Sequence, residues 1–283
     1  MSASDEFPAL SVVIPVHNEC DNIAPLVEEV ITSLQGRTRF EIICVDDASN
    51  DSSLAVLASL TLRHPLLRVL SHRKQAGQST AVRNGVKAAR GAWIATLDGD
   101  GQNDPGDLPQ MLQVRDAAPA NVKLVGGWRM QRRDNWSKRL ASVLANGLRK
   151  RLLRDGTPDT GCGIKLFERE AFLDLPYFDH MHRYLPALMQ RSGWKTLTVP
   201  VRHRERRSGT SNYNNLGRAW AGVFDLCGVV WLVRRSRVVA VRTVTEVADG
   251  LDTAGAEAGR AAPRSAQVPA GRMGVPPQAQ RTT

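Results

Sequence analysis

The feature that most constrains the fold is an alternation of apolar, β-branched runs with segments of helical periodicity. Five runs read as strands, at residues 10–16, 40–45, 67–70, 93–97 and 122–126. Helix-like segments separate the first four of them, at residues 22–34, 52–62 and 79–89. Strands that alternate with helices over short connections are typical of a mostly parallel sheet with helices on both faces. The sequence therefore predicts an α/β fold.

A polar cluster follows four of these apolar runs. The clusters occupy residues 17–19 (HNE), 46–47 (DD), 98–100 (DGD) and 128–129 (WR). In open α/β sheets, ligands bind beyond the carboxyl ends of the strands. We therefore expect the four clusters to meet at a single binding site.

The chain divides by composition into three parts. Residues 1–215 carry the strand and helix pattern and are predicted to form one folded domain. Residues 216–239 form an apolar segment that ends in Arg234, Arg235 and Arg237. Residues 240–283 are rich in Ala, Gly, Pro, Arg and Thr and lack aromatic side chains, which predicts a disordered tail.

The formal net charge of +10 indicates an anionic partner: a nucleic acid, an anionic membrane surface or a phosphorylated substrate. Aromatic residues make up only 5% of the chain and do not alternate with basic ones, so nucleic acid is the least expected partner. The four cysteines are isolated and suit a reducing compartment. The acidic, polar N-terminus does not resemble a signal peptide. The longest apolar run, residues 219–233, is shorter than the roughly 20 residues that a membrane span needs.

The acidic clusters are candidate ligand sites. Asp98 and Asp100 flank a glycine directly after a strand, and such oxygen ligands suit Mg²⁺ or Mn²⁺ bridging a diphosphate. Asp47 could accept hydrogen bonds from a nucleobase or ribose. Each pattern also fits a polar turn that caps the next helix, and His17 also fits an ordinary solvated loop. The residues alone leave these alternatives open.

Taken in order, the motifs resemble the family 2 glycosyltransferases of GT-A fold. The three that carry the likeness are residues 12–19 (VVIPVHNE), 45–49 (VDDAS) and 97–105 (LDGDGQNDP). Residues 159–167 and 203–213 are similar to later segments of the dolichyl-phosphate mannose synthases and bacterial polyprenyl-phosphate glycosyltransferases. The resemblance implies a GT-A catalytic domain.

The resemblance also implies roles for individual residues. Those that would line the nucleotide pocket are Pro15, His17, Glu19, Val45 and Asp47. Those that would hold the divalent cation and the diphosphate are Asp98, Asp100 and Gln102, with Gly99 between the two carboxylates. Arg129 would contact phosphate, and Arg206 and Ser211 would lie on a loop that closes over the donor. Asp100, Arg129 and Arg206 are the expected catalytic residues.

Three positions depart from the family pattern. His17 stands where the family usually has Tyr, Trp128 replaces a small hydroxyl residue, and Asn212 replaces a Lys. The last change removes one positive charge, for which Arg204 or Arg207 could substitute, although Arg and Lys differ in reach. The identity of the sugar is therefore left open.

The implied activity is the inverting transfer of a hexose from GDP-mannose or a UDP-sugar to a polyprenyl or dolichyl phosphate. An ionised phosphate attacks without a general base, in agreement with the lack of a base or nucleophile constellation in the sequence. One alternative is a family 2 enzyme with a glycan or small hydroxyl acceptor, for which Asp134, Asp155 or Asp159 could act as base. A second is a non-catalytic, basic nucleotide- or nucleic-acid-binding module.

Two basic amphipathic segments are candidates for membrane contact. Residues 129–154 combine Arg and Lys with leucines at helical spacing, and residues 219–233 lead into a basic end with Trp220 and Trp231. Both also fit helices packed on the core. We expect the protein to attach peripherally at the inner face of the cell membrane. A separate membrane-anchoring protein could assist this attachment.

Overall fold

The computed structural model describes residues 7–129, 151–153, 155–204 and 215–235, with side chains described from residue 222 in the last segment. All of them belong to the first of two compact units, Met1–Val238 and Val239–Thr283. Three predicted segments lie largely or wholly outside the described residues: the basic helix at 129–154, the loop with Arg206 and Ser211, and the tail at 240–283. The domain boundaries at 215 and 239 stay predictions.

Within the described residues, seven strands form one sheet in the order β3-β2-β1-β4-β6-β5-β7. The strands are β1 Leu10–Val16, β2 Phe40–Asp46, β3 Leu67–Ser71, β4 Trp93–Thr96, β5 Val122–Arg129, β6 Lys165–Glu168 and β7 Lys195–Val201. All neighbouring pairs are parallel except those of β6, which runs antiparallel to both β4 and β5. The prediction of a mostly parallel α/β sheet is confirmed.

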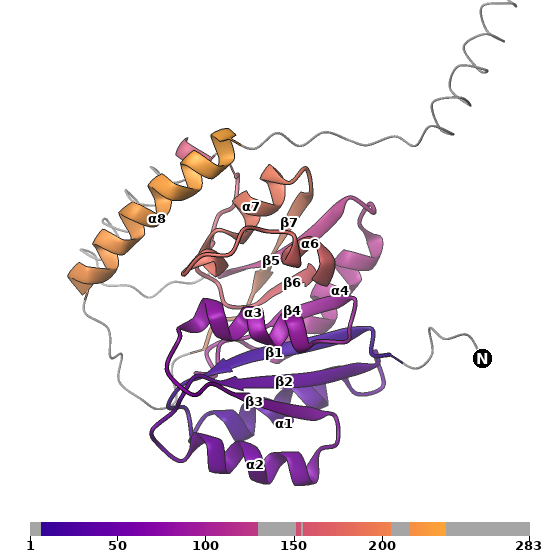
Figure 1. Cartoon of the computed structure of the whole chain (residues 1–283). Coiled ribbons are helices and arrows are strands. Elements are labelled where there is room, and N and C mark those ends of the chain that lie inside the picture. Colours follow the sequence, from indigo (N-terminus) through magenta and orange to yellow (C-terminus); the bar gives the residue numbers. More distant parts are fainter. Residues whose placement is uncertain (1–6, 130–150, 154, 205–214, 236–283) are drawn as a thin grey trace, which may run out of the picture. The chain divides into compact units, whose positions relative to one another are not determined.

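Helices cover both faces of this sheet (Figure 1). On one face lie α1 Ile23–Leu34, α2 Ser53–Arg63 and, after the short η2 Pro105–Asp107, α4 Leu108–Ala117. On the other lie α3 Gln78–Ala88, α6 Arg169–Leu173, η3 Met181–Arg183, α7 Leu185–Arg191 and α8 Asn215–Arg235. Strand side chains alternate between the faces, so Val12 and Ile14 join the first core and Val13 the second.

A close contact between α3 and β1 places the start of α3 near the strand ends. A Cβ atom on Gly85 of α3 would lie 2.4 Å from Cγ1 of Val13 and 3.2 Å from Cγ2 of Val45. Only a residue without a side chain allows the helix to approach the strands this closely.

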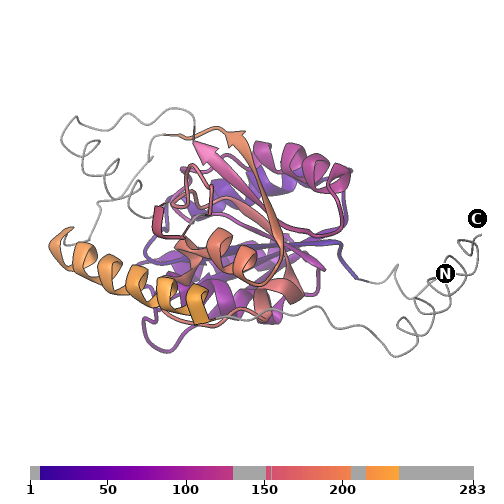
Figure 2. The same cartoon turned by 90° about the horizontal axis from the view of Figure 1, so that it is seen from above.

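The sequence located the first five strands and first three helices to within a few residues, but not β6 and β7. The apolar segment 219–233 lies within α8, which contacts α7 (Figure 2). Among the helices that the structure describes, none combines the length and apolarity that crossing a membrane requires.

Candidate active site

The parallel pairing brings the first three polar clusters to one edge of the sheet. Val16 pairs with Asp46 across β1 and β2, and the amide of Asp47 donates to the carbonyl of Val16 at 2.8 Å. β4 pairs with β1 on its other side and leads into Asp98. A Cβ atom on Gly99 would lie 2.8 Å from the carbonyl oxygen of Pro15, so the 98–100 loop lies directly against the end of β1.

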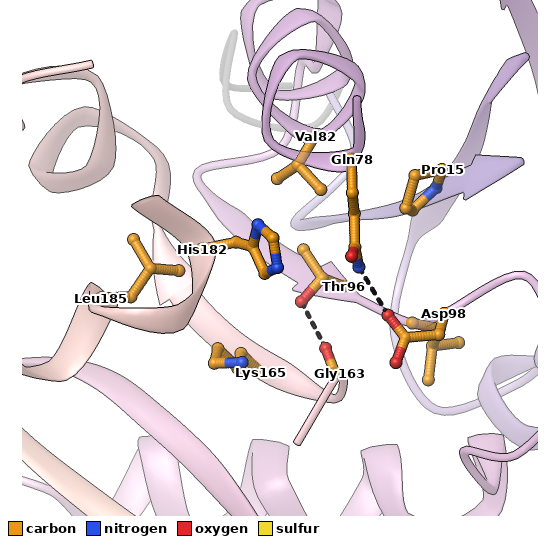
Figure 3. Close-up of a pocket in the computed structure, with 10 residues that line it drawn as sticks. Pro15, Gln78, Val82, Thr96, Asp98, Gly163, Lys165, His182 and Leu185 are labelled. Atoms are coloured by element: carbon orange, nitrogen blue, oxygen red, sulfur yellow. Dashed lines mark hydrogen bonds between the residues drawn. The ribbon is translucent and has the colours of Figure 1, made fainter. Parts of the chain in front are cut away.

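Asp98 is held in a defined orientation at the centre of this edge. Its Oδ1 accepts a hydrogen bond from Nε2 of Gln78 at 2.8 Å (Figure 3). Its amide donates to Oδ1 of Asn103 at 2.9 Å. A Cβ atom on Gly163 would lie 2.0 Å from Oδ2 of Asp98, so a side chain at position 163 would displace the carboxylate. Burial, and then the charge of Asp100, raise the pKa of Asp98 above its ordinary value.

The donor set fits a divalent cation that is shared with a substrate. Within the described part of the chain, no group of three or more His, Cys, Asp or Glu side chains could hold a metal ion. Burial is the main cause of the raised pKa of Asp98 and the negative charge of Asp100 adds to it, and a bound cation would offset both effects. Proteins usually hold Mg²⁺ through one or two carboxylates, and phosphate oxygens of the substrate and water molecules complete its coordination.

Asp47 faces into the protein rather than into open solvent. Its Oδ1 accepts from Nδ1 of His72 at 2.7 Å and from the amide of Ala76 at 2.8 Å, and its Oδ2 accepts from the amide of Gly77 at 2.8 Å. Burial by itself would raise the pKa of Asp47, but these three hydrogen bonds outweigh it and lower the pKa. Asp47 therefore fixes the loop at residues 72–77, and Gln75 of this loop lies beside His17, a residue predicted for the nucleotide pocket.

The other residues predicted for the nucleotide pocket differ in their surroundings. Nδ1 of His17 donates to the carbonyl of Asp47 at 2.9 Å, and Nε2 of His17 lies 3.2 Å from Nε2 of Gln75. Oε2 of Glu19 accepts from Nδ2 of Asn22 at 2.6 Å. Pro15 lines the same pocket as Asp98, whereas the side chain of Val45 is fully buried in the core.

Arg129, the last residue of β5, forms a bidentate ion pair with Asp159. Its Nε and Nη2 donate to Oδ2 and Oδ1 of Asp159 at 2.7 and 2.9 Å. Burial by itself would lower the pKa of Arg129, but the pairing with Asp159 outweighs it and raises the pKa. Asp159 is therefore committed to Arg129. Asp155 is buried, and its Oδ1 accepts from the amide of Thr157 at 3.2 Å.

Residues 202–204 border the loop at residues 98–102, which is predicted to bind the metal ion. The amide of Arg204 donates to the carbonyl of Gln102 at 2.9 Å, and its guanidinium group pairs with Glu29 at 2.5 Å and Asp104 at 2.7 Å. The chain thus enters the segment with Arg206 and Ser211 beside Gln102. Arg204 was one of two candidates to replace the missing Lys, and its guanidinium group pairs with these two carboxylates. The other candidate, Arg207, lies outside the described residues.

The sequence did not single out Gln78, Lys165 or His182, which line the pocket beside Asp98 (Figure 3). Lys165 is buried, its Nζ donates to the carbonyl of Cys162, and burial lowers its pKa. Burial, and then the charge of Lys165, lower the pKa of His182 well below 6.5, so the imidazole is neutral at physiological pH. Lys165 falls in the 159–167 motif, but the sequence carries no comparable signal for Gln78 and His182.

The fold and the site define a GT-A glycosyltransferase. The model of the family "Glycosyl transferase family 2" matches residues 11–175, and the chain belongs to this family.

Two relatives within reach of sequence comparison are polyprenyl-phosphate sugar transferases or synthases by name. The chain is 34% identical over 236 residues to a dodecaprenyl-phosphate galacturonate synthase of Rhizobium johnstonii. The aligned region covers 80% of this chain and 67% of the relative. The chain is 32% identical over 207 residues to an undecaprenyl-phosphate 4-deoxy-4-formamido-L-arabinose transferase of Edwardsiella ictaluri, covering 72% and 62%. The chain thus spans about two thirds of the length of these relatives.

Among solved structures, the fold is similar to that of glucosyl-3-phosphoglycerate synthase from Mycobacterium tuberculosis, which was crystallised with Mn²⁺, UDP and glucosyl-3-phosphoglycerate. The TM-score is 0.58 at 17% identity, covering 82% of this chain and 81% of that one. This similarity concerns the fold.

Proposed function

We propose that the protein transfers a sugar from a nucleotide-sugar to a polyprenyl phosphate, with inversion at the anomeric carbon. The observation that carries the proposal is the meeting of Asp98 and Asp100 with the loop held by Asp47 at one edge of the sheet. The names of the two relatives, both of which specify a polyprenyl phosphate, support this acceptor. The sugar and the nucleotide base are left to experiment.

Asp98, Asp100 and Gln102 would hold Mg²⁺ or Mn²⁺ in this proposal. When bound, the cation neutralises charge on the leaving diphosphate as a Lewis acid. The loop at residues 72–77, with Pro15, His17 and Glu19 beside it, would receive the nucleoside, and Gly99 would allow the diphosphate to approach the backbone. Arg206 and Ser211 belong to the segment that would close over the donor.

The reaction would be a single displacement. An oxygen of the acceptor phosphate forms a bond to the anomeric carbon while the bond to the nucleoside diphosphate breaks, and the electron pair of that bond leaves with the diphosphate. The attacking phosphate is already ionised, so the residues need only orient the reactants and stabilise charge. Arg129 has five N–H donors, of which Asp159 accepts two, and the guanidinium group could direct others at phosphate.

The pairing of Asp159 with Arg129 favours a phosphate acceptor over a hydroxyl acceptor. A hydroxyl group needs a base to take its proton, and Asp159 and Asp155 were candidates for that role. Asp159 is held by a guanidinium group and Asp155 is buried. Neither carboxylate is well placed to accept a proton from a substrate, and the third candidate, Asp134, lies outside the described residues.

The outer face of α8 supports attachment to a membrane surface. Leu226, Val229, Val230 and Val233 pack on the core, whereas Val223, Phe224 and Trp231 are exposed. The helix ends in the basic pair Arg234 and Arg235. An apolar stripe with a basic end suits the interface of an anionic bilayer. Such attachment would bring the site to the lipid-linked acceptor at the inner face of the cell membrane.

The test is a screen of nucleotide-sugars against polyprenyl phosphate, with and without Mn²⁺, for the wild type and Asp100→Ala. We expect one sugar to be transferred and Asp100→Ala to lower kcat/KM by on the order of 100-fold or more. The matched control is Asp116→Ala, which removes an exposed carboxylate that pairs with Arg115. Near-normal turnover of Asp100→Ala in the presence of Mn²⁺ would refute the metal assignment. Transfer to a glycan but not to polyprenyl phosphate would refute the acceptor.

A further inference from the structure

We propose that Gln78 is a positioning residue that orients Asp98 for the divalent cation. The inference rests on the proposed metal site and extends it to a residue on a different element, α3. It is carried by the hydrogen bond from Nε2 of Gln78 to Oδ1 of Asp98, 2.8 Å long, which Figure 3 shows between two residues that line the pocket.

The bond fixes one of the two carboxylate oxygens of Asp98. Oδ1 is occupied by Gln78, while Oδ2 lies over Gly163, where only a hydrogen atom fits. The backbone of Asp98 is fixed as well, because its amide donates to Oδ1 of Asn103. Rotation of the carboxylate would break the bond to Gln78 or drive an oxygen into Gly163. A ligand that is held in this way loses little conformational freedom when it binds a cation.

Gln78 can fix Asp98 because its own backbone is anchored on two sides. It is the first residue of α3, and the residue before it, Gly77, has a φ of 87° that favours glycine. The amide of Gly77 donates to Asp47. On the other side, the hydroxyl of Ser79 forms a hydrogen bond with Nδ1 of His182, with the two atoms 2.7 Å apart.

This arrangement connects the two halves of the donor site. Asp47 holds the loop at residues 72–77, the loop ends in Gly77, and Gln78 reaches from there to Asp98. The loop at residues 72–77 and the predicted cation ligand are thus joined through one side chain. Gln78 itself is exposed, so it adds little to the core and its substitution does not open a cavity.

The experiment measures Mn²⁺ binding directly, by the electron paramagnetic resonance signal of the free ion, on the full chain. Gln78→Met keeps the length of the side chain and removes its N–H donor. We expect its Kd for Mn²⁺ to rise about 10-fold or more, the usual effect of losing a residue that supports a metal ligand. The matched control is Thr80→Val on the same turn of α3, whose hydroxyl contacts Ala76 and Tyr177 instead. Its Kd should equal that of the wild type.

A second readout separates positioning from a structural role. The midpoint of thermal unfolding without metal should be the same for Gln78→Met and the wild type, and the rise caused by Mn²⁺ should be smaller in the variant. An unchanged Kd for Gln78→Met, or a lower metal-free midpoint that accounts for the weaker binding, would overturn the inference. If the wild type itself binds no Mn²⁺, or if Asp100→Ala binds it equally well, the proposed metal site fails first. That result differs from a failure confined to Gln78.

Discussion

Asp47 combines a buried carboxylate with three donors that all belong to one loop. His72, Ala76 and Gly77 are separated from it by the whole of β3, so no local pattern in the sequence relates them to Asp47. The carboxylate is stable as an anion only because these donors replace the water it has lost. The sequence predicted that Asp47 is a site residue. In the structure, its carboxylate binds the loop at residues 72–77.

Asp47→Asn should destabilise the protein at neutral pH by about 2 kcal/mol, because an amide accepts fewer and weaker hydrogen bonds from these donors. The pKa of Asp47 is lower in the folded protein than the ordinary value of 3.8. Its contribution is therefore complete above pH 3.8 and is lost as the pH falls through the folded-state pKa.

Urea unfolding of the wild type and Asp47→Asn at a series of pH values checks this prediction. The difference in the free energy of unfolding should shrink as the solution becomes acidic, while the exposed control Asp116→Asn shows no comparable change. A difference that is the same at every pH would mean that Asp47 acts through its shape rather than its charge.

At the scale of elements, the contact between α3 and β1 determines where Gln78 lies. A side chain at position 85 would overlap Val13, a stiff, buried residue of the central strand. The periodicity of residues 79–89 predicted the helix but not its distance from the sheet. That distance depends on which residue of another element faces the glycine.

Gly85→Ala should destabilise the protein even though alanine favours a helix. The gain in helix propensity is about 1 kcal/mol, whereas overpacking of a core costs about 1–3 kcal/mol. We expect a net loss of about 1 kcal/mol, measured by urea unfolding. Gly228→Ala in α8 is the control, because a Cβ atom there would meet nothing within 4 Å. A stabilised Gly85→Ala protein would show that α3 moves away from β1 at little cost.

At the scale of the whole molecule, the net charge and the outer face of α8 both support the proposed attachment to an anionic membrane surface. The net charge of +10 favours an anionic partner, and α8 exposes Phe224 and, one turn before its basic end, Trp231. Each buried aromatic side chain contributes about 1.5–3 kcal/mol to membrane partition.

Replacing Phe224 and Trp231 together with Ala should reduce binding to anionic lipid vesicles by at least about ten-fold. Flotation at low salt measures the bound fraction. The control is Leu62→Ala, because Leu62 is 88% exposed but lies on α2. Equal flotation of the double variant and the wild type would exclude α8 as the membrane-binding face.

The sequence by itself determined where the first five strands lie along the chain, the sheet class, the family and the placement of the acidic clusters at strand ends. These are properties of short segments: periodicity, turn residues and motifs are encoded within a few neighbouring positions. The tertiary structure decided the reversal of β6, the pairing of Arg129 with Asp159 and the contacts of Asp98. Ser79 and His182 lie 103 positions apart in the chain, and Gln78 and Asp98 lie 20 apart on different elements. Such contacts depend on how the elements pack, because a hydrogen bond forms only when folding brings donor and acceptor within about 3 Å.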